Sequence, residues 1–277
     1  MAKPGARPGA ALVVLNGGGD SAPALGGGLS ALLDGGVGIN GICGTSAGAF
    51  VGAYYCGGRF PVGGHYSDVI KNFLPQNYVS RRWFGLPRDN PSKYTTKKLR
   101  RFLTQHLKPT FGDCRIPFAC VAVDLATKRQ VIFSTQKTPD ASLALAVLAS
   151  GSPPYLFPAV EIDGRRHTDG GLTSNLCVDA EGLWGEDLSD VIALRLLQPG
   201  KAPKNPSGPF ELGAACIEAS IFENEREDIR DGVARGAQVI DIQIDNESLD
   251  LHLTSSDAVK LWDAGYAQVS LALRGMG

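Results

Sequence analysis

The sequence predicts an α/β protein built around a mainly parallel β-sheet. Residues 11–15 form a short, wholly apolar run that ends in three glycines, which is typical of a buried parallel strand before a loop. A helical pattern of leucines follows up to residue 34, and a second strand is expected at 37–43. A sharp turn and a helix at about 47–56 come next. Strand, helix, strand, turn and helix in this order indicate neighbouring parallel strands.

The rest of the chain continues the alternation of strands and helices. We expect one domain over residues 1–277, with a lid or insertion at about 57–110, where Arg, Lys and aromatic residues become more frequent. Residues 160–167 predict a β-hairpin, because the pair Asp163-Gly164 suits a type I′ turn. Other strands are expected at 118–124, 130–133, 191–197 and 239–244, and other helices at 66–74, 95–107, 141–149, 211–232 and 255–273.

Composition narrows the function classes. The chain has 277 residues, of which 43% are hydrophobic, enough for one large α/β core. The formal net charge of -1 gives no global attraction to nucleic acid, so we expect no nucleic-acid partner. The six cysteines form no C-x-x-C pair, which favours free, buried thiols over a zinc site. The first apolar run is too short for a secretory signal and no segment reaches transmembrane length, so we expect a cytoplasmic protein.

The pentapeptide Gly44-Thr45-Ser46-Ala47-Gly48 is the strongest chemical signal. It has the form G-x-S-x-G and lies between an expected strand and an expected helix, the context that a nucleophile elbow requires. Such a turn exposes the serine hydroxyl above the sheet, and the N-terminus of the next helix favours negative charge. Ser46 is therefore the candidate nucleophile of an acyl hydrolase. The alternative is an ordinary glycine-rich turn.

An acyl hydrolase also needs hydrogen-bond donors for the oxyanion of its tetrahedral intermediate. The loop Gly17-Gly18-Gly19 follows the first strand and can present backbone N–H groups beside the elbow. The amide of Ala47 can supply another donor. Alone, the glycine loop is equally compatible with a plain turn or a phosphate cradle. Together with the elbow on the next strand, it favours an oxyanion hole.

The base is the decisive question, because a Ser-His-Asp triad in α/β-hydrolase order needs a histidine late in the chain. The chain has four histidines, which are His65, His106, His167 and His252. Only His252 lies far downstream, and it sits in an apolar stretch. Asp169-Gly170-Gly171, directly after the hairpin, is the better candidate. The two glycines allow the chain to bend and hold the Asp169 carboxylate against the serine, and a carboxylate in a dry site can accept its proton.

At this point the sequence resembles the patatin-like phospholipases and lipid acyl hydrolases. The resemblance rests on the glycine loop, on GTSAGAFVGAYYCGG, on SPPYLFPAVEIDGRRHTDGGLTSN and on SSDAVKLWDAGYAQ, which occur in the family's order. It implies a three-layer α/β/α sandwich and a Ser-Asp dyad without histidine. It also implies hydrolysis of acyl esters, typically of glycerolipids, with no metal or other cofactor. Ser46 would be the nucleophile, Asp169 the base, and Gly17, Gly18 and Gly19 would surround the oxyanion hole.

The glycine loop departs from the family in one respect. The family usually has Arg or Lys shortly after the glycines, whereas here Asp20-Ser21-Ala22 follows Gly19. This leaves open a catalytically weak lipid-binding protein of the same fold. The string GGGDSAPAL also resembles the nucleotide-binding start of phosphofructokinases, so a phosphate- or nucleotide-binding enzyme is a third alternative. That alternative leaves GTSAG and the Asp169 motif unexplained.

Two segments of the expected insertion suggest peripheral contact with a lipid surface. Aromatic rings beside cations suit the membrane interface, and such residues are Arg81, Arg82, Trp83 and Phe84. The helix expected at 95–107 has four cations on one side and Leu99, Phe102 and Leu103 on the other, a layout compatible with lying on a bilayer. The alternative is that the rings of Trp83 and Phe84 fill a gap in the core.

Overall fold

A computed structural model describes residues 10–60, 74, 77–81, 89–178, 189–197, 205–245 and 253–276. Apart from Leu74, the helix expected at 66–74 lies outside these residues. The large sheet contains β1 (Ala10–Leu15), β2 (Gly38–Thr45), β5 (Phe118–Asp124), β6 (Arg129–Ser134), β7 (Val160–Ile162), β8 (Arg165–Asp169), β9 (Val191–Leu197) and β10 (Gln238–Gln243). The helices are α1 (Ala22–Asp34), α2 (Ala47–Cys56), α4 (Lys97–His106), α5 (Leu143–Ser150), α6 (Pro209–Ala234) and α7 (Ser255–Met276).

The sheet is mixed but mostly parallel, as the sequence predicts. Its order is β10-β9-β1-β2-β5-β8-β7, with β6 paired to β5. The strands from β10 to β5 are parallel, whereas β6, β7 and β8 run antiparallel to their neighbours. The expected hairpin is confirmed. Its turn residues Asp163 and Gly164 have φ values of 50° and 74°, the left-handed region that a type I′ turn needs.

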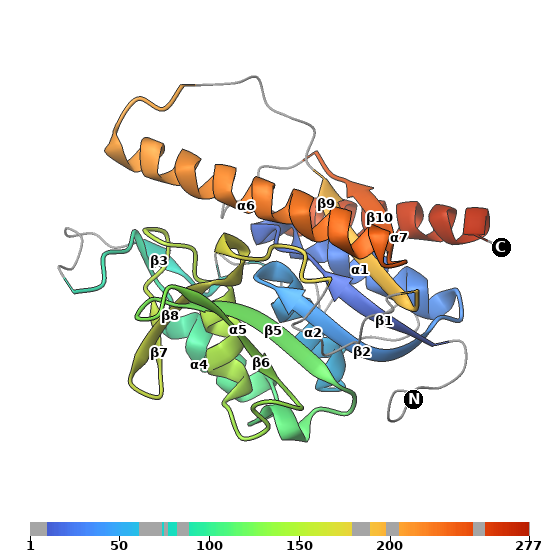
Figure 1. Ribbon diagram of the computed structural model, residues 1–277, viewed down its shortest axis with the longest axis horizontal. Coiled ribbons are helices and arrows are strands. Elements are labelled where there is room, and N and C mark those ends of the chain that lie inside the picture. Colours follow the sequence, from blue (N-terminus) through green and yellow to red (C-terminus); the bar gives the residue numbers. More distant parts are fainter. Residues whose placement is uncertain are drawn as a thin grey trace.

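Helices cover both faces of the sheet, which gives the three layers of an α/β/α sandwich (Figure 1). In β1, Val13 and Leu15 face the core shared with α1, α2, α5 and α7. The alternate residues Leu12 and Val14 face the opposite core, against which Ile229 of α6 packs. Both faces of β1 are therefore buried, which explains why its sequence shows no alternation of polar and apolar residues.

Helix α4 packs its apolar side into the protein. Phe102 and Leu103 are 7% and 1% exposed, and the Phe102 ring lies 6.2 Å from that of Tyr54 and 4.1 Å from that of His106. The expectation that this side of the helix lies on a bilayer is therefore wrong. Its cations remain at the surface because they occupy the opposite side.

All six cysteines are free thiols, as expected, but Cys216 is exposed on α6 and Cys114 is only half-buried.

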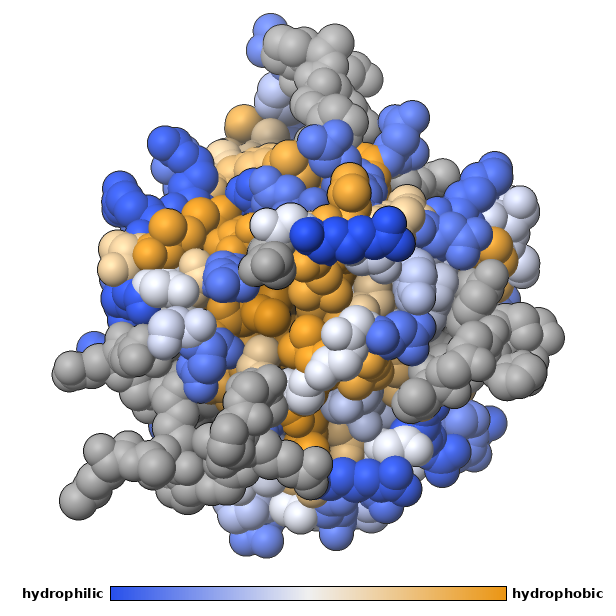
Figure 2. Space-filling model, turned by 90° about the vertical axis from the view of Figure 1, so that its right-hand side faces the viewer, coloured by the Kyte–Doolittle hydropathy of each residue, from blue (hydrophilic) through white to orange (hydrophobic). Residues whose placement is uncertain are grey.

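Within the described parts of the chain, no helix combines the length and the apolar character that crossing a bilayer requires. Apolar side chains reach the surface among charged ones on the face shown in Figure 2. The exposed large apolar residues are Leu125, Tyr155, Leu212, Phe222, Val233 and Leu271.

Candidate active site

Ser46 occupies the sharp turn between β2 and α2 that the sequence predicts. Its φ of 51° and ψ of -113° are unusual for a residue other than glycine, and such conformations cluster at functional sites. The flanking glycines make the turn possible because neither position has room for a side chain. A Cβ at Gly44 would lie 2.4 Å from the carbonyl oxygen of Gly48, and one at Gly48 would lie 2.2 Å from that of Leu15.

The end of α5 holds the turn in place. The amide of Ser46 donates a hydrogen bond of 2.9 Å to Oγ of Ser150, which is fully buried. Two residues later, the carbonyl of Ser152 accepts a hydrogen bond of 3.0 Å from the amide of Asp169. One short segment therefore positions both candidate residues.

The sheet itself explains why Asp169 lies beside Ser46. Strand β6 pairs with β5 from Ala119 to Asp124, so β2 and β8 must share the other edge of β5. Along that edge, Thr45 pairs with Val121 and Asp169 pairs with the next residue, Ala122. The C-terminal ends of β2 and β8 therefore meet. This brings the Ser46 hydroxyl close enough to the Asp169 carboxylate to lower its pKa.

Asp169 is 4% exposed, and its burial raises the pKa of the carboxyl to about 7. Two hydrogen bonds act in the opposite direction and lower this pKa, one from the Gly171 amide at 2.8 Å and one from Ser46. Burial has the larger effect, because desolvation penalises the charged form. At neutral pH the carboxylate is therefore partly ionised and more basic than an exposed aspartate, as a general base requires.

The two glycines after Asp169 are needed for close approach. A Cβ at Gly170 would lie 2.3 Å from the carbonyl oxygen of Val121. One at Gly171 would lie 3.0 Å from Oδ1 of Asn175 and 3.1 Å from Oδ1 of Asp169. The short 3-10 turn η4 (Gly170–Leu172) thus fits tightly between β5 and the carboxylate, as the sequence suggests.

The glycine loop corrects one expectation. The amide of Gly17 donates a hydrogen bond of 3.1 Å to the carbonyl of Asn175, so it is not a donor for an oxyanion. Gly17 instead provides space, since a Cβ there would lie 2.3 Å from Oδ1 of Asn175 and 3.3 Å from Cβ of Ser46. In the described part of the chain, the amides of Gly18, Gly19 and Ala47 have no acceptor. These three remain candidate oxyanion donors.

The acidic departure after the loop lies inside the protein. Asp20 and Ser21 are 2% and 0% exposed, in the short turn η1 (Gly19–Ser21) before α1. Gly19 has a φ of 57°, which favours glycine at this position. The glycines themselves are half-exposed, so solvent can reach the loop.

Neither described histidine contacts the Ser46 hydroxyl. His106 stacks on Phe102 and its Nδ1 lies 2.9 Å from the carbonyl of that residue. His167 is buried, with Nδ1 3.2 Å from the carbonyl of Arg165 and its ring against Phe133. His65 and His252 lie outside the described residues. Neither of these two rings is therefore placed to act as a base for Ser46.

Four polar residues around the site were missed by sequence reasoning. Ser150 holds the nucleophile turn, and Asn16 follows β1 directly before the glycine loop. Glu225 and Asp228 lie on the inward side of α6 and bind the segment after Asp169. A signal was present in the helical pattern. Glu225 and Asp228 share one side of α6 with Ile221, so carboxylates occur where apolar residues are expected.

The expected interfacial residues are only partly described. Arg81 is exposed at the end of β3 (Ser80–Arg81), which pairs with β4 (Tyr94–Thr95). Arg82, Trp83 and Phe84 lie outside the described residues.

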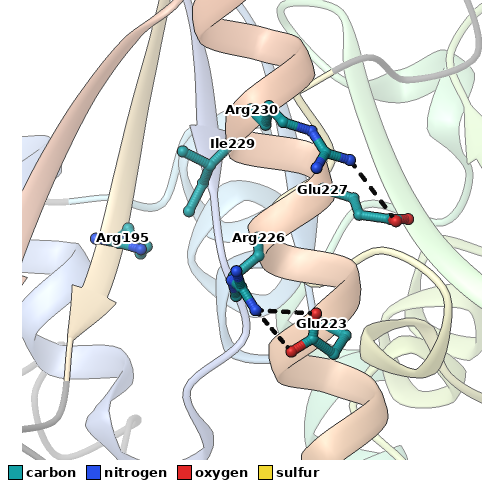
Figure 3. Close-up of a pocket in the computed structure, with 6 residues that line it drawn as sticks. All are labelled: Arg195, Glu223, Arg226, Glu227, Ile229 and Arg230. Carbon is teal, nitrogen blue, oxygen red and sulfur yellow. Dashed lines mark hydrogen bonds and ion pairs between the residues drawn. The ribbon is translucent and has the colours of Figure 1, made fainter.

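A surface pocket of about 320 Å³ lies between α6 and β9 (Figure 3). Its charges are largely paired with one another. Arg226 binds Glu223 at 2.8 Å and Arg230 binds Glu227 at 3.8 Å, while Arg195 reaches Asp241 at 2.6 Å. The lining residues are Arg195, Glu223, Arg226, Glu227, Ile229 and Arg230, none of which belongs to the site around Ser46.

Among solved structures, the chain is similar to VipD from Legionella pneumophila, with 14% identity and a TM-score of 0.58 over 97% of this chain and 67% of that one. It is also similar to ExoU of the type III secretion system of Pseudomonas aeruginosa in the ExoU–SpcU complex, with 17% identity and a TM-score of 0.46. That match covers 98% of this chain and 52% of ExoU, so the chain spans about half of ExoU. At these identities the likeness concerns the fold alone.

The family model described as patatin-like phospholipase matches residues 13–181, a stretch that makes up more than half of the chain and includes both Ser46 and Asp169. The chain therefore belongs to the patatin-like phospholipase family, which implies a lipid acyl hydrolase.

Proposed function

We propose that this protein is a serine acyl hydrolase that cleaves carboxylic ester bonds of lipids, with Ser46 as nucleophile and Asp169 as general base. One observation carries the proposal. The hydroxyl of Ser46, held in a strained turn, lies beside the buried carboxylate of Asp169, whose pKa is raised to about 7 by burial and lowered by its interaction with Ser46. A nucleophile and a base in direct contact are the minimum that ester cleavage requires.

Acylation would begin when Oγ of Ser46 attacks the ester carbonyl carbon and the Asp169 carboxylate takes the hydroxyl proton. The negative charge that develops on the carbonyl oxygen would be stabilised by the amides of Gly18, Gly19 and Ala47. Donors of this kind contribute about 3–4 kcal/mol each in other hydrolases. The tetrahedral intermediate then collapses, the ester C–O bond breaks, and Asp169 returns the proton to the leaving alkoxide. The acyl group remains on Ser46.

Deacylation would repeat these steps with water as the nucleophile. The Asp169 carboxylate takes a proton from the attacking water, and the second tetrahedral intermediate expels Oγ of Ser46. The proton then returns to the serine, and a free carboxylic acid is released. Asp169 acts as base and then as acid in both halves, which suits a group whose pKa is about 7.

The test compares two site variants with a matched control. Ser46→Ala and Asp169→Asn should each lower turnover of a short-chain p-nitrophenyl ester by about a thousand-fold or more, because the dyad acts as a unit. A fluorophosphonate should label the wild type at Ser46 but not Ser46→Ala. Asp163→Asn, the same chemical change at an exposed turn residue, should retain full activity. An inactive, unlabelled wild type that still binds lipid vesicles would favour the weak lipid-binding alternative.

The insertion extends the proposal to the lipid surface. The sequence places Trp83 and Phe84 between arginines, and the double variant Trp83→Ala/Phe84→Ala should lower hydrolysis of vesicle substrates several-fold while sparing a soluble ester. Equal loss on both substrates would indicate a role in the core instead.

A further inference from the structure

A buried carboxylate of α6 joins the two loops that flank Ser46. Glu225 is 9% exposed, and its Oε2 accepts a hydrogen bond from Nδ2 of Asn175 and another, of 3.3 Å, from Nδ2 of Asn16. Its Oε1 lies 3.9 Å from the Arg195 guanidinium. Burial raises the pKa of Glu225, whereas these three partners lower it. A single side chain thus satisfies two buried amides from segments far apart in the sequence.

Asn16 connects Glu225 to the glycine loop and to the nucleophile turn. It is 1% exposed and directly precedes Gly17. Its Oδ1 accepts from the amide of Leu196 at 3.0 Å, and its carbonyl accepts from the amide of Gly48 at 3.1 Å. Movement of Asn16 would therefore shift the start of the glycine loop and the first turn of α2 together.

Asn175 connects the same carboxylate to the Asp169 loop. It follows η4, is 7% exposed, and its carbonyl accepts the Gly17 amide at 3.1 Å. Its Oδ1 lies against both Gly17 and Gly171, where a Cβ would come within 2.3 Å and 3.0 Å of it. Asn175 thus touches the glycine loop on one side and the Asp169 loop on the other.

We propose that Glu225 is a positioning residue that fixes the glycine loop and the Asp169 loop relative to each other through Asn16 and Asn175. The inference rests on the proposed function for its catalytic consequence. Without an acceptor at residue 225, Nδ2 of Asn175 would lose its partner, and Nδ2 of Asn16 would keep only its hydrogen bond of 3.4 Å to the Leu196 carbonyl. The link between the two asparagines would then be broken. Among the described residues, the two loops share one other hydrogen bond, from the Gly17 amide to the Asn175 carbonyl.

The experiment separates the acceptor from the charge. Glu225→Ala removes the acceptor, whereas Glu225→Gln keeps an oxygen that can face both asparagines. Glu223→Ala is the matched control, because Glu223 is an exposed carboxylate on the same helix and pairs only with Arg226 among the described residues. If Glu225→Ala does not fold, Glu225→Asp replaces it, since the shorter side chain cannot reach both asparagines.

The first measurement is independent of activity. Hydrogen exchange at the Gly17 amide, which is bonded to Asn175, should become at least ten-fold faster in Glu225→Ala and stay close to wild type in Glu225→Gln and Glu223→Ala. Unchanged exchange in a folded Glu225→Ala protein would overturn the inference, whether or not the protein hydrolyses esters. Faster exchange in a protein whose wild type proves inactive would uphold the link between the loops and refute the proposed function.

The second measurement is steady-state hydrolysis of a soluble ester. Glu225→Ala should lower kcat about 10- to 100-fold with little change in KM, because small misplacements of reacting groups cost this much. Glu225→Gln should restore most of kcat, which a general loss of stability would not predict. Asn175→Ala should show the same loss, and the double variant no further loss, because both changes break one link. Full kcat in Glu225→Ala would overturn the positioning role.

Discussion

At the scale of single residues, Asp169 is subject to opposing effects. Burial raises the pKa of its carboxyl, while hydrogen bonds from Gly171 and Ser46 lower it, and the result is about 7. A fully exposed aspartate would be ionised but too weak a base, whereas a buried one without these donors would stay protonated at neutral pH. The two hydrogen bonds therefore keep a buried carboxylate usable as a base.

This balance predicts the pH dependence of ester hydrolysis. The base must be ionised to accept the serine proton, so kcat/KM should fall as the pH drops through about 7 and level off above it. A soluble p-nitrophenyl ester measured from pH 5 to 9 should give one ionisation near 7 in the free enzyme. A profile that stays flat down to pH 5 would mean that Asp169 is not the base.

The sequence was sufficient to predict the sharp turn at Ser46 and the glycine turn after Asp169, because the glycines that make each turn are adjacent to it in the chain. The expectation about the Gly17 amide was wrong for the opposite reason. Its acceptor is the carbonyl of Asn175, which follows a different strand and comes near only when the sheet is assembled. Ser150 was missed on the same grounds, since nothing in the apolar helix pattern of α5 points to the Ser46 amide.

At the scale of elements, α1 and α7 cross at a distance that only glycine allows. A Cβ at Gly27 would lie 2.0 Å from the carbonyl oxygen of Trp262, and one at Gly265 would lie 1.9 Å from that of Ala24. These are backbone atoms of helices, which cannot move aside without separating the helices. The sequence pattern placed both helices but gave no sign that they touch.

Gly27→Ala should therefore destabilise the protein even though alanine is the better helix former by up to about 1 kcal/mol. Overpacking of this kind costs about 1–3 kcal/mol, measured as the loss in free energy of unfolding in urea. Gly275→Ala is the control, because it lies in the same helix pair, on α7, with nothing within 4 Å of its Cβ position. It should be neutral or slightly stabilising. Equal stability of both variants would contradict the close crossing.

At the scale of the whole molecule, the site lowers the stability of the fold at neutral pH. Burial raises the pKa of Asp169 and of Asp228 to about 7, and it raises that of Glu225. Between about pH 4 and 7 the folded state keeps protons that the unfolded state has lost, so the free energy of unfolding falls as the pH rises. Asp124 and Asp257 have lowered pKa values, and their contribution is lost only at more acidic pH.

Asp169→Asn should for this reason make the protein more stable while abolishing hydrolysis. Asparagine cannot ionise, so it avoids the cost of a buried carboxylate, and its Oδ1 can still accept from the Gly171 amide. The gain should be smaller at pH 5 than at pH 8, where wild-type Asp169 is charged in the folded protein and the gain should reach the order of a few kcal/mol. Urea unfolding of both proteins at the two pH values measures this difference. Asp163→Asn is the control, because it makes the same chemical change at the exposed hairpin turn. If Asp169→Asn gained no more at pH 8 than at pH 5, the carboxylate would not be held at a cost to the fold, and the pKa of about 7 would be wrong.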